Sequence, residues 1–240
     1  MRIAVISDIH GAAEPFSRAL ANAKIIGYDQ LILLGDLFTY GVEPERCRDL
    51  AAEAIEKQGA VFIGGNHDQV YTELAKGESA YLNGRPSWLV ESILWTWNRI
   101  GSTWPNSLTW RNEWVSDCVL FAHANPYGFG DWTYLNSPEQ QEKACAAMAS
   151  LGQRAGVFGH VHRYGAYSAF GVDLFVVGSI GQPRSGSTGV PEWALVDLCK
   201  KHVIVERQAV NFDSVKFCMN IQAMTTLTQH TRNHLCKFFQ

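Results

Sequence analysis

Short apolar runs alternate with amphipathic stretches over the first third of the chain. The runs at 3–6, 31–34 and 60–63 predict buried strands. Between them apolar residues recur at helical spacing, and Gly27 and Gly59 follow the two predicted helices as C-caps, with Pro44 opening the second. The order strand, helix, strand, helix, strand is typical of a βαβαβ unit with a parallel sheet.

The pattern weakens in the rest of the chain. We expect a helix over 91–100, a loop over 101–114 and a strand over 118–121. Ser137, Pro138 and Gln140 predict the capped start of a helix that ends near 151, before a strand at 156–158. Extended segments at 165–170, 174–177, 193–197 and 202–206 predict an antiparallel, hairpin-rich part.

The last segment gives no firm pattern. Residues 207–240 are rich in Thr, Gln, Asn and His, and we expect there a terminal helix or a loose tail. No shift in composition marks a linker, so we expect one domain over 1–206, with 207–240 as a C-terminal extension of the same domain.

Composition narrows the class of protein. With 240 residues, 47% hydrophobic and 18% charged, the chain is globular and not disordered. A net charge of −3 argues against a general attraction to nucleic acid or anionic membranes. Apolar runs are shorter than a membrane span or a signal-peptide core, which predicts a cytoplasmic protein without membrane contact. The six cysteines show no C-x-x-C spacing, and we expect all to be reduced and buried.

Polar side chains follow five of the predicted strands directly. Sites in parallel α/β sheets lie outside the carboxyl ends of strands, so these residues are expected to meet. Oxygen and imidazole ligands without a thiolate suit Mn²⁺, Fe or Zn²⁺. Each fragment alone is weak, but five in this order make coincidence improbable: Asp8 with His10, Asp36, Asn66 with His67 and Asp68, His123, and His160 with His162.

This series resembles the motifs D-x-H, G-D, G-N-H-D, H and G-H-x-H of the calcineurin-like metallophosphoesterase superfamily. Two further segments, 35–41 and 178–184, resemble G-D-x-x-x-Y-G and G-S-x-G-Q-P-R of a small bacterial branch. That branch is similar to small phosphodiesterases and dinucleoside polyphosphate hydrolases. The resemblance implies an α/β fold, a four-layer sandwich of two mixed β-sheets flanked by α-helices.

The resemblance also implies a set of roles. Two divalent metal ions are expected, Mn²⁺ first and Fe or Zn²⁺ as alternatives, with a bridging hydroxide that attacks the phosphoester. His67 would face the substrate as the general acid, and Asp68 would orient it. The implied ligands are Asp8, His10 and His162 for one ion, Asn66, His123 and His160 for the other, and Asp36 for both.

Candidates for substrate contact are fewer. The Arg184 guanidinium would bind a phosphate oxygen, with a structural ion pair as the equal alternative, and Tyr40 is a second candidate. Where small relatives often have Gly after the ligand His123, this chain has Ala124, which puts the substrate side in question. The Trp-rich stretch 88–132 is expected to pack a core or cap, whereas three aromatic residues could lie near the cleft: Phe129, Trp132 and Tyr134.

These observations predict a metal-dependent phosphoesterase that acts on a small phosphodiester, a nucleotide or a dinucleoside polyphosphate. A protein Ser/Thr phosphatase is the first alternative, but that branch has G-N-H-E and R-G where this chain has Asp68 and Tyr40-Gly41. A nuclease is the second, and the net charge argues against a long nucleic acid. A non-catalytic metal-binding scaffold is the third, although such relatives usually lack the histidine that matches His67. The oligomeric state stays open, a homo-oligomer included.

Overall fold

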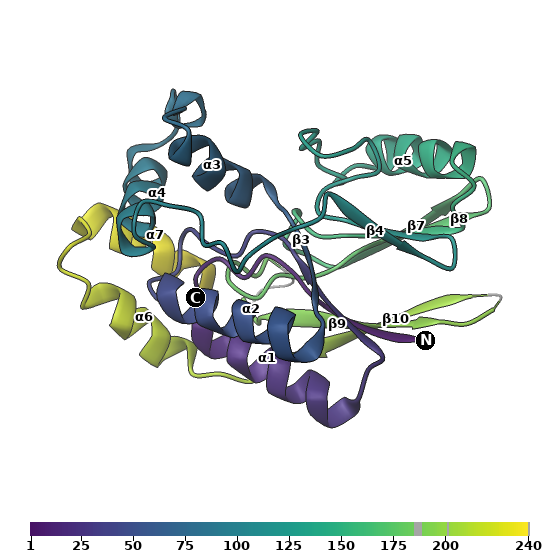
Figure 1. The fold of residues 1–240 in the computed structure, drawn as a ribbon, viewed down its shortest axis with the longest axis horizontal. Helices are drawn as coiled ribbons and strands as arrows, with labels where there is room; N and C mark the ends of the chain where they lie inside the picture. The colour runs from purple at the N-terminus through teal and green to yellow at the C-terminus, as the bar shows by residue number, and fades with distance from the viewer. Residues whose placement is uncertain (185–188, 201, 240) are drawn as a thin grey trace.

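Two five-stranded sheets face each other in the computed structural model, which describes residues 1–184, 189–200 and 202–239. The strand orders are β10-β9-β1-β2-β3 and β4-β5-β6-β8-β7. Figure 1 shows α1 and α2 outside the first sheet and α5 outside the second. The expected arrangement of two mixed sheets flanked by helices is confirmed.

The first sheet contains the predicted βαβαβ unit. Its strands β1 (Arg2–Ile6), β2 (Gln30–Leu34) and β3 (Val61–Ile63) are parallel, and α1 (Ala13–Ile26) and α2 (Pro44–Gln58) connect them. Pro44 occupies the first turn of α2, and Gly59 ends it with a left-handed φ of 64°. The hairpin of β9 (Glu192–Leu198) and β10 (Val203–Ala209) extends this sheet, with β9 antiparallel to β1.

The second sheet is mixed. Its central strands β5 (Val119–Ala122), β6 (Ala155–Phe158) and β8 (Val172–Val176) are parallel, while β4 (Glu113–Ser116) and β7 (Gly165–Ala169) are antiparallel edges. Helix α5 (Pro138–Ser150) starts with the expected capping box of Ser137 and Gln140.

Alternation along the strands builds the layers. Ile3, Val5 and Ile32 point toward Phe121 and Val157 in the core between the sheets. Their neighbours on the same strands point outward and pack on the helices. Both faces of the central strands are buried, which is why they appear in the sequence as continuous apolar runs.

The structure differs from the expected elements in several places. Helix α4 (Ser87–Arg99) begins before the predicted 91, and β4 lies partly in the predicted loop. Strand β8 pairs parallel with β6, so the second half is not purely antiparallel. The 3₁₀ turn η1 (Ala80–Leu82) and helix α3 (Asn66–Ala75) were not predicted. Helix α3 has few apolar residues that would predict it from the sequence. Tertiary contacts of its first turn stabilise it instead.

The C-terminal segment is ordered as two helices and not as a loose tail. α6 (Ser214–Gln222), α7 (Gln229–Cys236) and the 3₁₀ turn η2 (Lys237–Phe239) bury Phe217, Ile221 and Leu235 in the core that holds α1 and α2. Asp213 and Thr228 cap the two helices through their side-chain oxygens. Strand β10 continues past residue 206, and the division of the chain into 1–206 and 207–240 stays a prediction.

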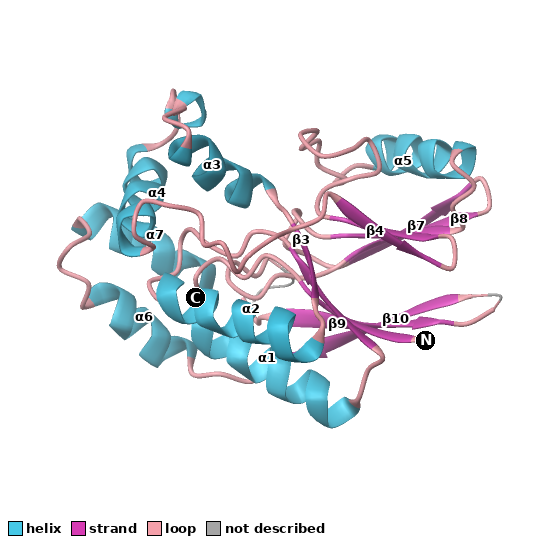
Figure 2. Cartoon of the chain, viewed as in Figure 1, coloured by secondary structure: helices cyan, strands magenta, loops and turns pink. Residues whose placement is uncertain are grey.

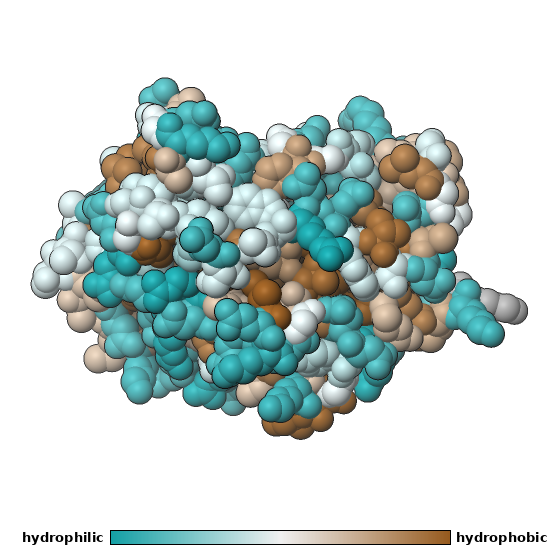
Figure 3. Space-filling view, viewed as in Figure 1, coloured by the Kyte–Doolittle hydropathy of each residue, from teal (hydrophilic) through white to brown (hydrophobic). Residues whose placement is uncertain are grey.

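All six cysteines are free, but three of them are not buried as expected: Cys218 is half-buried, and Cys118 and Cys199 are exposed. Cys118 and Cys199 lie in exposed turns beside β5 and β9, because the apolar runs of these strands stop short of them. Among the described residues, no helix is both long and apolar enough to cross a membrane. The face in Figure 3 is largely hydrophilic, with scattered apolar side chains.

Candidate metal centre and active site

The loops after β1, β2, β3, β5 and β6 converge, and Figure 2 shows these loops at the centre of the molecule. They bring two groups of buried ligand atoms together, each within 4.8 Å. One group is Asp8, His10, Asp36 and His162, and the other is Asp36, His123 and His160. Asp36 belongs to both groups. Asn66, the first residue of α3, follows β3 on the same side.

Three buried polar atoms here have no hydrogen-bond partner among the described residues: Asp36 Oδ2, Asn66 Oδ1 and His123 Nε2. Asp36 Oδ2 lies 3.5 Å from His123 Nε2 and 3.7 Å from His10 Nε2. An unpaired buried polar atom costs free energy, so a native structure keeps it when a ligand completes it. Oxygen and imidazole atoms in this arrangement fit divalent cations.

Backbone carbonyl groups fix the orientation of the four imidazoles. His10 Nδ1 donates to Phe38 O at 3.1 Å, His123 Nδ1 to Leu34 O at 2.7 Å and His162 Nδ1 to Gln182 O at 3.1 Å. His160 instead donates through Nε2 to Trp132 O, also at 3.1 Å. Because a carbonyl oxygen only accepts, each bond leaves the other ring nitrogen unprotonated in the neutral ring and free to coordinate a cation.

Five of these residues have left-handed backbone conformations. The φ values are 51° for Asp8, 49° for His10, 55° for Asp36, 64° for His160 and 62° for His162. A residue with a side chain pays roughly 1–2 kcal/mol for this conformation. Strain of this kind persists where the surroundings over-determine it, and it gathers at functional sites. Here it turns side chains out of the strand ends toward one point.

Two motif glycines make room for the ligands. A Cβ on Gly65 would lie 2.2 Å from Asp36 Oδ1, and a Cβ on Gly159 would lie 2.1 Å from Ser7 Oγ and 2.8 Å from Asp8 Oδ2. Glycine therefore precedes Asn66 and His160 because the Asp36 carboxylate and the Ser7 hydroxyl occupy the space of a side chain.

The charges in the site favour a cation. Burial opposes ionisation of Asp36, but the nearby imidazoles, His123 first, hold its pKa well below the ordinary value. Burial also opposes protonation of His123, yet Asp36 and Asp8 raise its pKa to about 10. The carboxylates thus draw positive charge to the position where the unpaired atoms meet.

His67 differs from the other histidines because hydroxyl groups contact both of its nitrogens. Nδ1 lies 3.2 Å from Thr39 Oγ1, which in turn lies 2.6 Å from Tyr71 OH, and Nε2 lies 3.2 Å from Tyr40 OH. Burial lowers the pKa of His67 below its ordinary value, and the charge of Asp36 opposes this shift.

The described hydrogen bonds of the Asp68 carboxylate go to backbone groups and not to the His67 ring. This carboxylate accepts the backbone N–H groups of Gly65, Asp36 and Leu37 at 2.8–3.0 Å. Burial, followed by the charge of Asp36, raises the pKa of Asp68 to about 7. Asp68 ties the loop after β2 to the start of α3, and Thr39, which the sequence analysis missed, contacts the imidazole. No sequence motif distinguishes Thr39.

Two tyrosines and one arginine, in addition to Tyr40, lie around the centre. The Tyr134 ring stacks on His160 with a centroid distance of 4.2 Å, and the Tyr81 ring lies 6.2 Å from His67. Burial raises the pKa of Tyr81, and the Asn66 side chain opposes this shift. The Arg85 guanidinium lies 4.4 Å above the Tyr81 ring, which places it within about 11 Å of the His67 ring. Tyr134 was expected near the cleft, whereas neither Tyr81 nor Arg85 carries a sequence signal.

Arg184, the expected phosphate ligand, lies near enough to Tyr134 for its charge to affect the pKa of that tyrosine. It is exposed, its guanidinium donates to Gln182 Oε1, and within the described residues it has no carboxylate partner. Burial raises the pKa of Tyr134, and both Arg184 and Arg85 oppose this shift, so both positive charges act at the Tyr134 hydroxyl.

The segment from 178 to 184 also supports the metal centre. Ser179 Oγ donates to Asp8 O at 2.9 Å, and the carbonyl group of Gln182 accepts from His162. Most of the expected tryptophans have structural contacts; Trp104 and Trp110, for example, pack edge to face beside Phe62.

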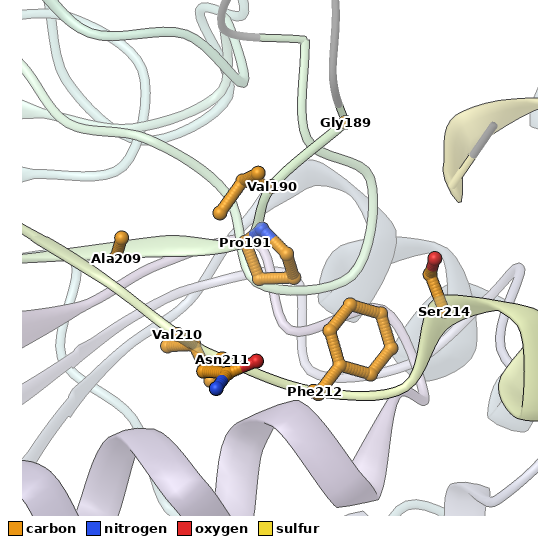
Figure 4. Close-up of a pocket in the computed structure, with 8 residues that line it drawn as sticks. All are labelled: Gly189, Val190, Pro191, Ala209, Val210, Asn211, Phe212 and Ser214. Carbon is orange, nitrogen blue, oxygen red and sulfur yellow. The ribbon is translucent and has the colours of Figure 1, made fainter.

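A separate pocket of about 280 Å³ lies where the chain leaves β10 (Figure 4). Its lining has no ionisable side chain, so it offers no group for acid–base chemistry. The lining residues are Gly189, Val190, Pro191, Ala209, Val210, Asn211, Phe212 and Ser214.

Comparison with solved structures supports the fold. A hypothetical protein, PH1004 from Pyrococcus horikoshii, is similar over 98% of this chain and 97% of its own, with a TM-score of 0.80 and 17% identity. A metallophosphoesterase from Sphaerobacter thermophilus is similar over 99% of this chain and all of its own, with a TM-score of 0.71 and 19% identity. At these identities the likeness is one of fold.

Sequence comparison gives the family. The uncharacterized protein MJ0912 of Methanocaldococcus jannaschii is 33% identical over 138 residues, which span 55% of this chain and about half the length of that relative. The sequence model of the calcineurin-like phosphoesterase family matches residues 1–164, the range that holds every expected metal ligand. From this match, the two-sheet fold and the gathered His and Asp side chains, we conclude that the chain belongs to the calcineurin-like phosphoesterase family.

Proposed function

We propose that the site holds two divalent ions, Mn²⁺ first among them, and hydrolyses a small phosphodiester, a nucleotide or a dinucleoside polyphosphate. The observation that carries this proposal is the position of Asp36. Asp36 belongs to both groups of ligand atoms, and its unpaired Oδ2 lies 3.7 Å from His10 Nε2 and 3.5 Å from His123 Nε2, so one carboxylate would serve both ions. Asp8, His10 and His162 would hold one ion, and Asn66, His123 and His160 the other.

When bound, such ions neutralise phosphoryl charge and lower the pKa of a coordinated water molecule. The protein contributes the proton for the leaving oxygen. If Thr39 donates to Nδ1 of His67, the imidazole proton lies on Nε2, beside the Tyr40 hydroxyl. His67 is therefore placed to donate a proton, or a hydrogen bond, toward the leaving group.

The rim of the site fits an anionic ligand. Arg184 and Arg85 have no ion-pair partner in the part of the chain that is described, and each guanidinium has donors left for phosphate oxygens. The exposed part of the Tyr134 ring offers an apolar surface on which a nucleobase or another planar group would pack. These features favour a small phosphorylated molecule over a long polyanion, which would need a basic stripe.

Turnover by protein reconstituted with Mn²⁺ tests the proposal. The panel is bis-p-nitrophenyl phosphate, p-nitrophenyl phosphate, a cyclic dinucleotide and diadenosine tetraphosphate, with Asp36→Asn as the control for contaminating activity. We expect Mn²⁺-dependent hydrolysis of at least one diester or polyphosphate that Asp36→Asn loses together with metal. Two bound ions without turnover of any panel member would refute the proposed activity. The cytoplasmic location stays a prediction.

A further inference from the structure

Tyr40 has a backbone conformation that its own sequence does not favour. Thr39 and Tyr40 have φ values of 76° and 69°, and a positive φ is unusual for residues of this size. Contacts from other elements must hold the pair in place. One of these contacts comes from α4, because Ser92 Oγ of that helix accepts the Tyr40 backbone N–H at 3.0 Å.

The other contacts come from the C-terminal extension. The Phe238 ring lies 5.8 Å from the Tyr40 ring and 6.4 Å from the Trp88 ring. Trp88 lies 6.0 Å from Tyr40 and stacks on His234 of α7 at 5.2 Å. Tyr40, 9% exposed, is thus enclosed by α4 on one side and by the end of the chain on the other.

Helix α7 is anchored to α4 by one carboxylate. Glu91 accepts the backbone N–H of Thr228 at 2.7 Å and the hydroxyl groups of Thr228 and Thr231. Three bonds to one carboxylate at the first turn of α7 fix where the helix starts, and therefore where His234 and Phe238 lie. Figure 1 shows α7 beside α4, at the end of the molecule away from β10.

We propose that residues 229–239 position Tyr40 against His67, with Phe238 as the positioning residue. The Tyr40 hydroxyl is the group at His67 Nε2, the nitrogen that we place on the leaving-group side. A shift of the Tyr40 ring breaks that contact, so the last helix of the chain belongs to the active site. This inference rests on the proposed function.

Matched phenylalanine variants test the inference. Phe238→Ala removes the contact with Tyr40, and Phe238→Leu keeps much of its volume. Phe212→Ala is the control, because Phe212 is also half-buried but contacts Phe217 and Phe239. Tyr40→Phe keeps the ring and removes the hydroxyl. The substrate is the panel member with the poorest leaving group that the wild type hydrolyses.

We expect Phe238→Ala to lower kcat about 3- to 10-fold, the effect of about one hydrogen bond, with KM and metal content unchanged. Phe238→Leu should recover most of the loss, and Phe212→Ala should stay within about twofold of the wild type. In the Tyr40→Phe background, Phe238→Ala should add less than about twofold, because the hydroxyl that it positions is absent.

Two results would overturn the inference. One is a kcat for Phe238→Ala equal to that of Phe212→Ala, and the other is a full multiplicative loss in the Tyr40→Phe background. A wild type without turnover would instead refute the proposed function.

In that case the packing of Phe238 on Tyr40 is measured by NMR. The ring resonances of Tyr40 are observed in ¹³C-tyrosine-labelled protein and assigned with Tyr40→Phe. They should shift in Phe238→Ala and not in Phe212→Ala, and unchanged resonances would overturn the inference.

Discussion

Replacing Gly65 with alanine tests whether the spacing of the metal centre depends on a missing side chain. Gly65 has φ −104° and ψ 179°, a conformation that alanine adopts freely, so the cost of Gly65→Ala is steric. The new Cβ would lie 2.2 Å from Asp36 Oδ1 and 2.7 Å from the Asp36 backbone nitrogen. The carboxylate cannot turn away without losing the bond from the His67 backbone N–H at 2.8 Å.

The magnitude follows from these contacts. Overpacking a close-packed site costs about 1–3 kcal/mol, and the lost hydrogen bond adds about 1 kcal/mol. A total of about 2–4 kcal/mol lowers the melting temperature of a chain of this size by about 4–16 °C. Since Asp36 belongs to both groups of ligand atoms, we also expect fewer than two bound ions per chain.

Thermal unfolding with and without Mn²⁺ measures the stability, and elemental analysis of the reconstituted protein measures the metal content. Gly165→Ala is the matched control, because the same Cβ at Gly165 meets nothing within 4 Å. If Gly65→Ala bound two ions and melted at the same temperature as Gly165→Ala, the steric account of this motif would be wrong.

Three other perturbations test separate parts of the site. His67→Ala should keep its metal and lose turnover by roughly 10²–10⁴-fold, with a smaller loss for p-nitrophenolate leaving groups. Steady-state rates and metal analysis measure this, and loss of metal would contradict the role of His67. Arg85→Ala should raise KM for a polyphosphate substrate about 10-fold, the low end for a charge-assisted hydrogen bond, while Arg18→Ala, an exposed arginine paired with Glu14 on α1, should not. Mn²⁺ at about 100 times its Kd should raise the melting temperature by about 5–11 °C per site, and a chelator should reverse the rise; equal melting curves would show that the folded protein does not bind the ion.

The extent to which the sequence predicted the fold differs between elements. Runs such as 3–6 and 31–34 were recognisable because both faces of these strands are buried, one by helices and one by the opposite sheet. Helices α3 and α7 were not, because their apolar residues are few and irregular. Their positions depend on caps and on side chains distant in sequence, such as Glu91 beneath Thr228.

The sequence by itself determined which candidate ligand residues follow the strands and in what order the chain presents them. Each ligand follows an apolar run directly, and the ends of parallel strands meet at one edge, so Asp8 and Asp36 could be placed together without coordinates. Only the tertiary structure decided how these residues are aimed and what surrounds them. The left-handed turns at Asp8 and His160, the hydroxyl groups on His67 and the packing of Phe238 on Tyr40 all join residues far apart in the chain. Periodicity reports only which face of an element is buried, whereas these contacts exist only once the two sheets and the last helix have packed.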